Sequence, residues 1–173
     1  LEELNLIAKL AKRYDLLVIS DEVYEFLTFD NVQHIPFATL PEMKERTVTI
    51  SSMGKTFGMT GWKIGYAVAP PNLTAAIQKI HQWTAYAVNT PGQHAMAFAL
   101  SQLDSYLPEF RKLYQSKRDF LFNELKNTKF KPHLPKGSYF MMVDIPAEKQ
   151  VDDIKCAMEL VETKGVVTIP PSV

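Results

Sequence analysis

The stretch that says most about the fold of this 173-residue chain is Ser51-Ser52-Met53-Gly54-Lys55-Thr56-Phe57-Gly58-Met59-Thr60-Gly61-Trp62-Lys63-Ile64-Gly65-Tyr66. Lys55 lies in a turn of small residues, just after the apolar run 47–51. Ser52 precedes it by three positions and Lys63 follows it by eight. Because open α/β sheets bind ligands where their strands end, this spacing predicts a site that combines an amine, a hydroxyl and a second cation.

A second motif of the same kind lies about thirty residues earlier. The apolar run 16–20 predicts a strand buried on both faces, and Asp21-Glu22-Val23-Tyr24 follows it directly. Asp21 and Tyr24 therefore add a carboxylate and a phenol at a second strand end. A third apolar run, 64–69, stops at two prolines. Three such runs with few turn dipeptides between them indicate an α/β layered sheet.

The remaining periodicity predicts helices around this sheet. The opening helix is marked by apolar residues three and four apart, namely Leu4, Ile7, Ala8, Ala11 and Tyr14. After the third run we expect a helix that Asn72 caps, with inward positions Leu73, Ala76, Ile77, Ile80 and Trp83. The next is expected to start with a capping box at Thr90-Pro91-Gly92-Gln93.

A change of pattern in the second half indicates a second, smaller lobe. A long helical stretch carries Phe110, Leu113, Tyr114, Lys117 and Leu121 on one side, as a helix connecting two lobes would. Strands are expected over 129–132 and 138–144, followed by a helix whose inward residues are Val151, Ile154, Met158 and Val161. We predict two domains, residues 1–105 and residues 106–173.

The composition excludes several classes of function. Nineteen acidic and nineteen basic residues balance, so the chain has no basic field for nucleic acid or for an anionic membrane. No apolar run approaches the roughly 20 residues that span a bilayer. Cys156 is the only cysteine, which excludes an internal disulfide and favours a cytoplasmic protein. Its helical surroundings predict a buried, neutral thiol.

Two apparent motifs are decoys. Gly54-Lys55-Thr56 imitates the end of a P-loop, but that loop needs glycine five positions before Gly54, where Thr49 stands in a predicted strand. The four histidines, at positions 34, 81, 94 and 133, show no metal-ligand spacing with one another or with Cys156. We therefore predict no metal site.

Lys55, Ser52 and Lys63 together suit a phosphorylated aldehyde. A lysine amine becomes a nucleophile when desolvation or a neighbouring cation lowers its pKa. Ser52 can donate its hydroxyl to a phosphate, and Lys63 supplies a permanent positive charge beside it. A scaffold protein has no need for a lysine in this turn, so the pattern favours an enzyme.

These motifs resemble those of the fold type I, pyridoxal-phosphate (PLP) dependent aminotransferases of class I/II. The resemblance is carried by Asp21-Glu22-Val23-Tyr24-Glu25, Gly54-Lys55-Thr56-Phe57 and Thr60-Gly61-Trp62-Lys63-Ile64-Gly65. The sequence is most similar to the kynurenine/glutamine transaminase and methionine aminotransferase branch, through Met59-Thr60-Gly61-Trp62-Lys63, Val88-Asn89-Thr90-Pro91 and Lys136-Gly137-Ser138-Tyr139-Phe140.

The resemblance implies a role for each site residue. Lys55 would form a Schiff base with PLP and move the proton in transamination between an amino acid and a 2-oxo acid. Asp21 would pair with the pyridine nitrogen and Tyr24 with the ring oxygen. Ser52 and Lys63 would bind the phosphate. Many relatives carry arginine in place of Lys63, and lysine keeps the charge but loses the two-pronged hydrogen bonding.

The resemblance also implies an architecture and a substrate class. We expect part of the mainly parallel, helix-covered sheet of the large PLP-binding domain, with part of the smaller α+β C-terminal domain. A homodimer is expected, with methionine, aromatic or kynurenine-like amino acids as substrates. Family members carry further site residues outside the matching segment, so we expect this chain to be an internal fragment that is inactive when isolated.

Three alternatives remain at this stage. β-Elimination of cysteine conjugates would use the same residues without an amino acceptor. A transcription regulator can carry an aminotransferase-like domain as a PLP-binding sensor. A degenerate fold could serve only as a scaffold, although the joint presence of Lys55, Asp21, Tyr24 and Ser52 argues against decay.

Overall fold

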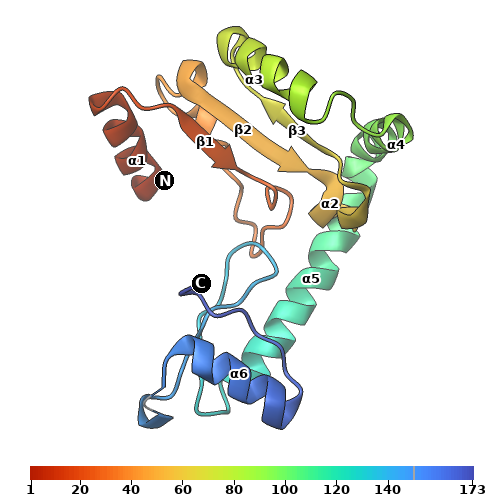
Figure 1. Ribbon diagram of the computed structural model, residues 1–173. Coiled ribbons are helices and arrows are strands. Elements are labelled where there is room, and N and C mark those ends of the chain that lie inside the picture. The colour runs from red at the N-terminus through yellow and green to blue at the C-terminus, as the bar shows by residue number, and fades with distance from the viewer. Residues whose placement is uncertain (150) are drawn as a thin grey trace. The chain divides into compact units, whose positions relative to one another are not determined.

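The computed structural model describes residues 1–149 and 151–173, which form two compact units. Unit 1 comprises Leu1–Lys112 with Lys136–Ser138, and unit 2 comprises Leu113–Pro135 with Tyr139–Val173. The division into domains 1–105 and 106–173 remains a prediction. The helices and strands of Figure 1 are, in chain order, α1 (Glu2–Arg13), β1 (Val18–Asp21), β2 (Thr47–Ser52), α2 (Met53–Thr56), β3 (Gly65–Val68), α3 (Pro71–Thr84), α4 (Thr90–Ser101), α5 (Leu103–Leu125), β4 (Lys131–Pro132), β5 (Val143–Asp144) and α6 (Asp153–Lys164).

Unit 1 is built on a three-stranded sheet in the order β1-β2-β3. β1 and β2 are parallel, with Asp21 opposite Ile50, so their carboxyl ends lie at the same edge. β3 is antiparallel to β2, with Ser51 opposite Tyr66. The connection from β2 to β3 holds only the short α2 and the 3₁₀ turn η3 (Thr60–Trp62), which is too little for the crossover helix that a parallel return requires. The α/β expectation is confirmed, with a mixed rather than purely parallel arrangement here.

The first strand differs from the sequence prediction in its start and in its burial. β1 begins at Val18 instead of residue 16, and Ile19 is 72% exposed, so burial on both faces was wrong. Val18 packs against the small core formed by Ala8, Ala11, Phe37, Leu40 and Met43, whereas no described element covers the side of Ile19. A continuous apolar run predicts an extended, sheet-forming segment but cannot report what covers each of its faces.

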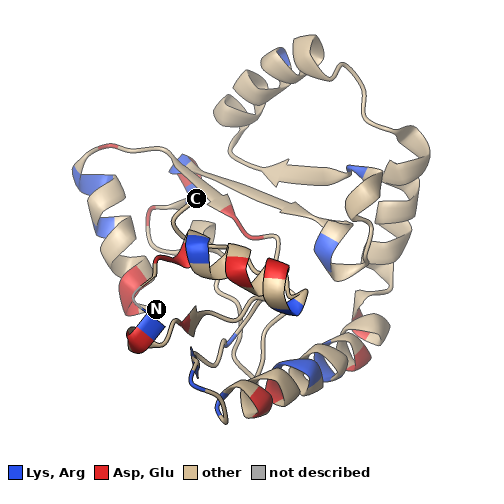
Figure 2. Cartoon of the chain, turned by 60° about the horizontal axis from the view of Figure 1, so that its bottom comes forward, with Lys and Arg blue, Asp and Glu red and all other residues tan. Residues whose placement is uncertain are grey.

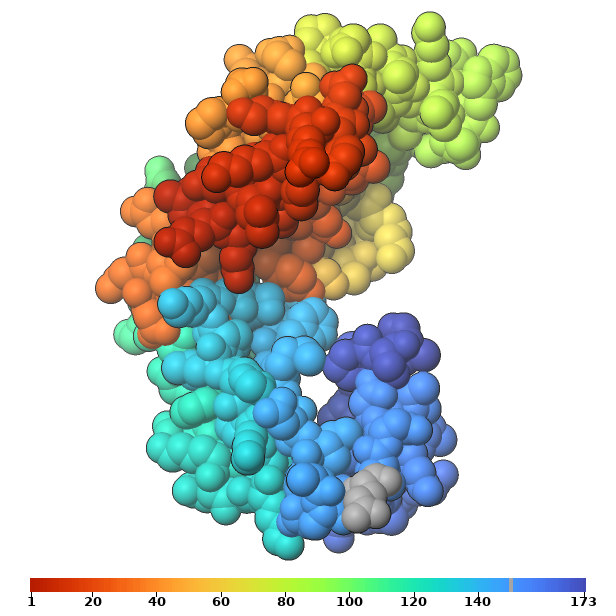
Figure 3. All heavy atoms as spheres, turned by 90° about the vertical axis from the view of Figure 1, so that its left-hand side faces the viewer, coloured from red at the N-terminus to blue at the C-terminus, as the bar shows by residue number. Residues whose placement is uncertain are grey.

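The opening helix is confirmed as α1. Its residues Ala8 and Ala11 are buried against a small core that Phe37, Leu40 and Met43 complete. The other side of the helix stays accessible, and Figure 3 shows α1 in red on the face turned to the viewer. This packing anchors the chain just before β1.

The helix after the third strand is present but differs in its cap and its face. α3 begins at Pro71 with Pro70 as N-cap residue, and Asn72 makes no cap hydrogen bond because it already lies inside the first turn. Proline at the first helical position is preset for this start. Among the described residues nothing buries the predicted inward side, and Trp83 is 85% exposed.

α3 and α4 carry very little charge. Figure 2 shows them almost entirely tan, and Lys79 is the only Lys, Arg, Asp or Glu residue in either helix. None of the helices in residues 1–149 and 151–173 has the length and apolar character needed to cross a membrane.

The start of α4 is close to the prediction but uses another cap. Asn89, not Thr90, is the N-cap residue, and its Oδ1 accepts a hydrogen bond from Gly92 N at 3.1 Å. The Gln93 side chain donates to the Val88 carbonyl instead of closing a capping box. A Cβ on Gly92 would come within 2.9 Å of Ile64 Cγ1, so this first turn packs tightly on the segment before β3.

The long helix is confirmed as α5, which continues across the boundary between the units. In unit 2, Arg118 is buried, donates from Nη1 to the Pro135 carbonyl at 3.1 Å and pairs with Asp119 at 2.7 Å. Tyr114 stacks on Tyr139 with ring centroids 6.1 Å apart. The contacts with Pro135 and Tyr139 hold α5 against the chain between β4 and β5.

The rest of unit 2 has the predicted order with shorter strands. β4 and β5 pair antiparallel over two residues each. α6 is capped by Asp152 and ends at Gly165 in a left-handed conformation. Its buried residues are Cys156 and Ala157, so the buried thiol is confirmed, whereas the predicted inward side was wrong, with Ile154, Met158 and Val161 exposed.

Thr47, at the start of β2, provides a test of the buried interior. Its side chain is 1% exposed, and its hydroxyl has no hydrogen-bond partner within the described chain. Thr47→Val keeps the shape and removes the unsatisfied hydroxyl, so we expect the free energy of unfolding to rise by about 1 kcal/mol. Urea denaturation of the full-length protein measures this. Thr49→Val, in the same strand but partly exposed, serves as the control and should change little; a Thr47→Val variant less stable than wild type would contradict the prediction.

Candidate active site

The predicted site residues meet where β1 and β2 end. Asp21 is the last residue of β1, Ser52 is the last of β2, and Lys55 lies in α2 directly after it. These three residues line a hollow of about 600 Å³ in unit 1. The other residues of its wall come from the neighbouring strands and from α3: Val23, Ile50, Ser51, Gly65, Tyr66, Ala67, Thr74, Ile77, Gln78 and His81.

Lys55 is held on a short but braced helix. α2 has only four residues, and side chains from elsewhere in unit 1 donate hydrogen bonds to its carbonyls. Thr60 Oγ1 donates to Gly54 O at 2.8 Å, and the Tyr106 hydroxyl donates to Thr56 O at 2.8 Å. The Tyr106 ring also packs on Phe57, with centroids 4.6 Å apart. Lys55 therefore projects from a backbone that is fixed on both sides.

Ser52 combines a structural and a binding capacity. Its Oγ accepts a hydrogen bond from Gly54 N at 3.2 Å and so caps α2. A Cβ on Gly54 would lie 3.3 Å from both Ser52 Oγ and Thr60 Cα, so glycine permits this close turn. Because Oγ acts here as an acceptor, its own hydrogen is left to donate.

Asp21 and Tyr24 lie near Lys55 but in different ways. Asp21 is exposed, and its Oδ1 accepts a hydrogen bond from Val23 N at 3.2 Å. Tyr24 follows in the turn after β1, and Lys55 Nζ lies 6.0 Å from the centroid of its ring. Asp21 thus borders the hollow, whereas Tyr24 flanks the amine from outside the hollow's wall.

Lys63 is the predicted site residue that the structure does not bring to the hollow or beside Lys55. It is exposed at the end of η3 and does not line the hollow. Its backbone is left-handed, with φ 55° and ψ 44°, a conformation that residues other than glycine seldom adopt. Strained backbone of this kind is common at functional positions.

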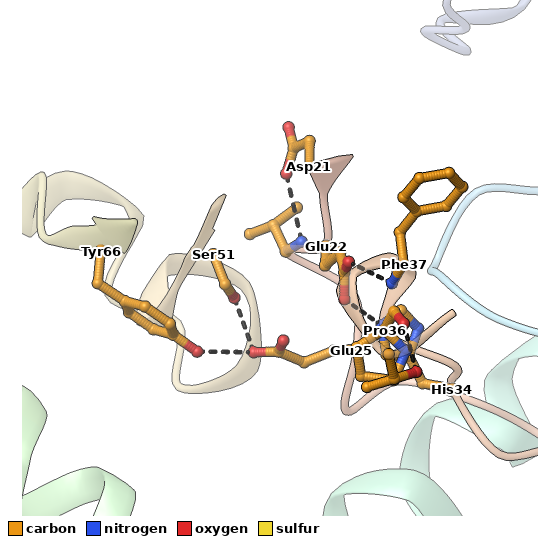
Figure 4. A network of polar contacts seen from close by, with 10 residues as sticks. Asp21, Glu22, Glu25, His34, Pro36, Phe37, Ser51 and Tyr66 are labelled. Atoms are coloured by element: carbon orange, nitrogen blue, oxygen red, sulfur yellow. Dashed lines mark hydrogen bonds and ion pairs between the residues drawn. The ribbon is translucent and has the colours of Figure 1, made fainter. Parts of the chain in front are cut away.

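The structure adds a polar network that the sequence did not predict (Figure 4). One oxygen of Glu25 accepts hydrogen bonds from Ser51 Oγ at 2.7 Å and from the Tyr66 hydroxyl at 3.0 Å. Asp21 stands apart from these three side chains. The signal in the sequence was weak, because Ser51 and Tyr66 become neighbours only through the antiparallel register of β2 and β3.

Glu22 forms a second branch of this network. It is buried, and its two oxygens bind Phe37 N at 3.0 Å and His34 Nε2 at 2.6 Å. Among the described residues, Glu22, Glu25 and His34 form a group whose ligand-type atoms lie within 4.8 Å of one another. A hydrogen bond accounts for the proximity of Glu22 and His34, whereas Glu25 is bound by Ser51 and Tyr66, and no metal is assigned to the group.

The environment of Tyr66 in this network favours the neutral, protonated phenol. Burial raises the pKa of its phenol above the ordinary value of 10.0, and the nearby Ser51 hydroxyl opposes that rise. The negative charge of Glu25 and its hydrogen bond raise the pKa further, as does Glu22. Tyr66 is therefore held as a neutral hydrogen-bond donor toward Glu25.

Comparison with known proteins identifies the family. The model of the class I and II aminotransferase family matches residues 1–173, and the chain belongs to this family. The expectation drawn from the resemblance is confirmed. Class I and II aminotransferases depend on PLP, which makes PLP the cofactor of the family.

Individual relatives show which members the chain is similar to. It is 42% identical to a kynurenine–oxoglutarate transaminase of Dictyostelium discoideum, with 99% of this chain and 44% of the relative covered. It is also 42% identical to the methionine aminotransferase of Escherichia coli strain K12, covering 92% of this chain and 42% of that protein. The chain thus spans less than half the length of these curated relatives.

Solved structures agree with the fold. The N-succinyldiaminopimelate aminotransferase from Mycobacterium tuberculosis superposes with a TM-score of 0.93 at 39% identity, over 99% of this chain and 44% of that one. An Escherichia coli structure described as having a methionine aminotransferase function gives a TM-score of 0.88 at 38% identity, over 98% of this chain and 44% of that one.

The residues around the hollow fit PLP by their chemistry. PLP carries an aldehyde, a pyridine nitrogen and a phosphate, which require an amine, a carboxylate and hydrogen-bond donors respectively. Lys55, Asp21 and Ser52 supply these three types of group along one wall. Gly54 has no side chain that could lie against the Ser52 hydroxyl, because a Cβ there would come within 3.3 Å of Ser52 Oγ.

The raised pKa of Tyr66 predicts how stability depends on pH. A phenol whose pKa is higher in the folded than in the unfolded state supports folding fully below its unfolded pKa, and that support is lost as the pH rises through the folded pKa. We expect the free energy of unfolding to fall as the pH rises above about 10, the ordinary pKa of a tyrosine, and to fall less in Tyr66→Phe. Urea denaturation across this range measures both slopes; equal slopes would contradict the prediction.

Proposed function

We propose that the protein containing this chain is a PLP-dependent aminotransferase that moves an amino group between an amino acid and a 2-oxo acid. The observation that carries the proposal is that Asp21, Ser52 and Lys55 line one hollow at the ends of two parallel strands. Membership of the class I and II aminotransferase family supports it.

Each residue has a role that follows from its position and chemistry. Lys55 Nζ would hold the aldehyde carbon of PLP covalently, and Asp21 would keep a proton on the pyridine nitrogen. Tyr24, beside Lys55, would donate to the ring oxygen. Ser52 would donate its hydroxyl hydrogen to the phosphate, and the ammonium of Lys63 would neutralise part of the phosphate charge.

The reaction needs a base and a fixed geometry, and the chain offers both. Bound PLP supplies an electron-accepting ring conjugated to the substrate Cα. Lys55, once freed from the cofactor, would take the proton from the substrate Cα and deliver it two bonds away, to the former aldehyde carbon of PLP. The braced ends of α2 hold the lysine backbone during this transfer, because Thr60 and Tyr106 bind its carbonyls.

The substrate class and assembly follow the relatives. Kynurenine–oxoglutarate transaminases and a methionine aminotransferase are among the similar proteins, so we propose methionine, aromatic or kynurenine-like amino acids as donors. We also propose a cytoplasmic homodimer. The relatives named here are all aminotransferases, and for that reason neither a β-lyase nor a PLP-binding regulator is proposed.

Covalent trapping tests the central assignment. Borohydride reduction of the full-length protein with PLP should leave one adduct on the peptide that contains Lys55, because reduction makes the lysine–cofactor bond permanent. Peptide mass mapping locates it. Lys55→Ala should lose the adduct and all transamination activity, while Lys44→Ala, at the opposite end of β2, should retain both. An adduct on another lysine would refute the assignment.

The phosphate role of Lys63 has its own test. Lys63→Ala removes a charged hydrogen-bond donor, so the dissociation constant for PLP should rise about tenfold or more, whereas Lys63→Arg should retain wild-type affinity within about threefold. Equilibrium dialysis against PLP measures the constants, and Lys44→Ala again serves as the matched control. Unchanged affinity in Lys63→Ala would remove Lys63 from the site.

A further inference from the structure

Glu25 lies beside the proposed cofactor site but has no role in the function described so far. Its Oε1 accepts two hydrogen bonds, from Ser51 Oγ at 2.7 Å and from the Tyr66 hydroxyl at 3.0 Å. The donors are 26 and 41 residues away along the chain. One carboxylate oxygen therefore joins the turn after β1 to both β2 and β3 (Figure 4).

The positions of the two donors connect this oxygen to the site. Ser51 and Tyr66 are direct partners in the antiparallel pairing of β2 and β3, and both border the hollow. Ser51 precedes Ser52, and Glu25 follows Tyr24. The carboxylate thus ties together the segments that carry four of the five proposed site residues: Asp21, Tyr24, Ser52 and Lys55.

The direction of the hydrogen bonds also matters. A hydroxyl has a single hydrogen to donate, and the Ser51 and Tyr66 hydroxyls both donate theirs to Glu25 Oε1. Neither hydroxyl then competes with Ser52 or Lys55 as a donor to a ligand in the hollow. Ser51 is only 1% exposed, so water cannot replace Glu25 as its partner without a change in the strand.

We propose that Glu25 is a positioning residue of the cofactor site, which fixes the end of β2 by binding Ser51 and Tyr66. The inference rests on the proposed function, because it concerns how firmly Ser52 and Lys55 are presented to PLP. Glu25 acts through its acceptor oxygen rather than through its charge. The neighbouring Glu22 is held separately by Phe37 and His34.

Two substitutions separate the acceptor oxygen from the charge. Glu25→Gln keeps an oxygen that can accept from both hydroxyls, and Glu25→Ala removes it. In the full-length protein we expect Glu25→Gln to bind PLP within about threefold of wild type and Glu25→Ala to bind about tenfold more weakly, as is typical when a residue supporting a binding group is lost. Equilibrium dialysis well below the unfolding temperature measures both constants.

Further variants keep the proposal testable if Glu25→Ala does not fold. Ser51→Ala and Tyr66→Phe each remove one hydrogen bond to Glu25, and each should weaken PLP binding by about threefold. A purely structural role would lower the unfolding temperature of these variants and leave the PLP constant of the folded protein unchanged. That result, or wild-type affinity in Glu25→Ala, would overturn the proposal.

A second readout needs no cofactor. The titration of the Tyr66 phenol can be followed in the apoprotein by absorbance at the tyrosinate band. Wild type and Glu25→Gln are each compared with the same protein carrying Tyr66→Phe, and the difference in absorbance reports Tyr66. Removal of the Glu25 charge should lower the pKa of Tyr66, so the phenol of Glu25→Gln should titrate at a lower pH than that of wild type. An unchanged titration would show that Glu25 does not bind Tyr66 and would overturn the inference.

The outcomes distinguish the two proposals. A wild-type protein that takes up no PLP overturns the proposed function and, with it, the positioning role of Glu25. If wild type binds PLP and a folded Glu25→Ala variant binds it with the same affinity, only the role of Glu25 is overturned. Affinity lost equally in Glu25→Gln and Glu25→Ala would assign the effect to charge and would likewise refute positioning by the acceptor oxygen.

Discussion

The parallel pairing of β1 with β2 is the constraint on which the site depends. Asp21 lies opposite Ile50, so the carboxyl ends of the two strands stop at one edge of the sheet. A carboxylate from one strand and a hydroxyl from the other then border the same hollow, although they are separated by about thirty residues in the sequence. Lys55 joins them because the chain turns into α2 directly after β2.

The short elements at this edge are stabilised by side chains rather than by their own length. A helix of four residues has no stability by itself, since helix formation is cooperative and its nucleus is costly. Side chains from η3 and α5 bind the carbonyls of α2, and Glu25 binds Ser51, the next-to-last residue of β2, and its partner Tyr66 in β3. The reactive lysine is thus placed by long-range hydrogen bonds.

Local patterns predicted some features of the chain well. The helix spacing predicted α1, α5 and α6, and the apolar runs predicted the three strands of unit 1. They failed where the answer depended on neighbours: Asn89 replaced Thr90 as a cap, Ile19 and Trp83 proved exposed, and the buried residues of α6 were Cys156 and Ala157. Periodicity describes one segment, whereas burial depends on the elements that pack against it.

The sequence by itself determined the family and the kinds of group at the site, because Lys55, Ser52 and Asp21 stand at recognisable distances from apolar runs. Only the tertiary structure decided that β3 returns antiparallel, that Ser51 faces Tyr66 and that both bind Glu25. The physical reason is that hydrogen bonds between distant segments depend on strand direction and register. Neither quantity is encoded in the spacing of residues along a single segment.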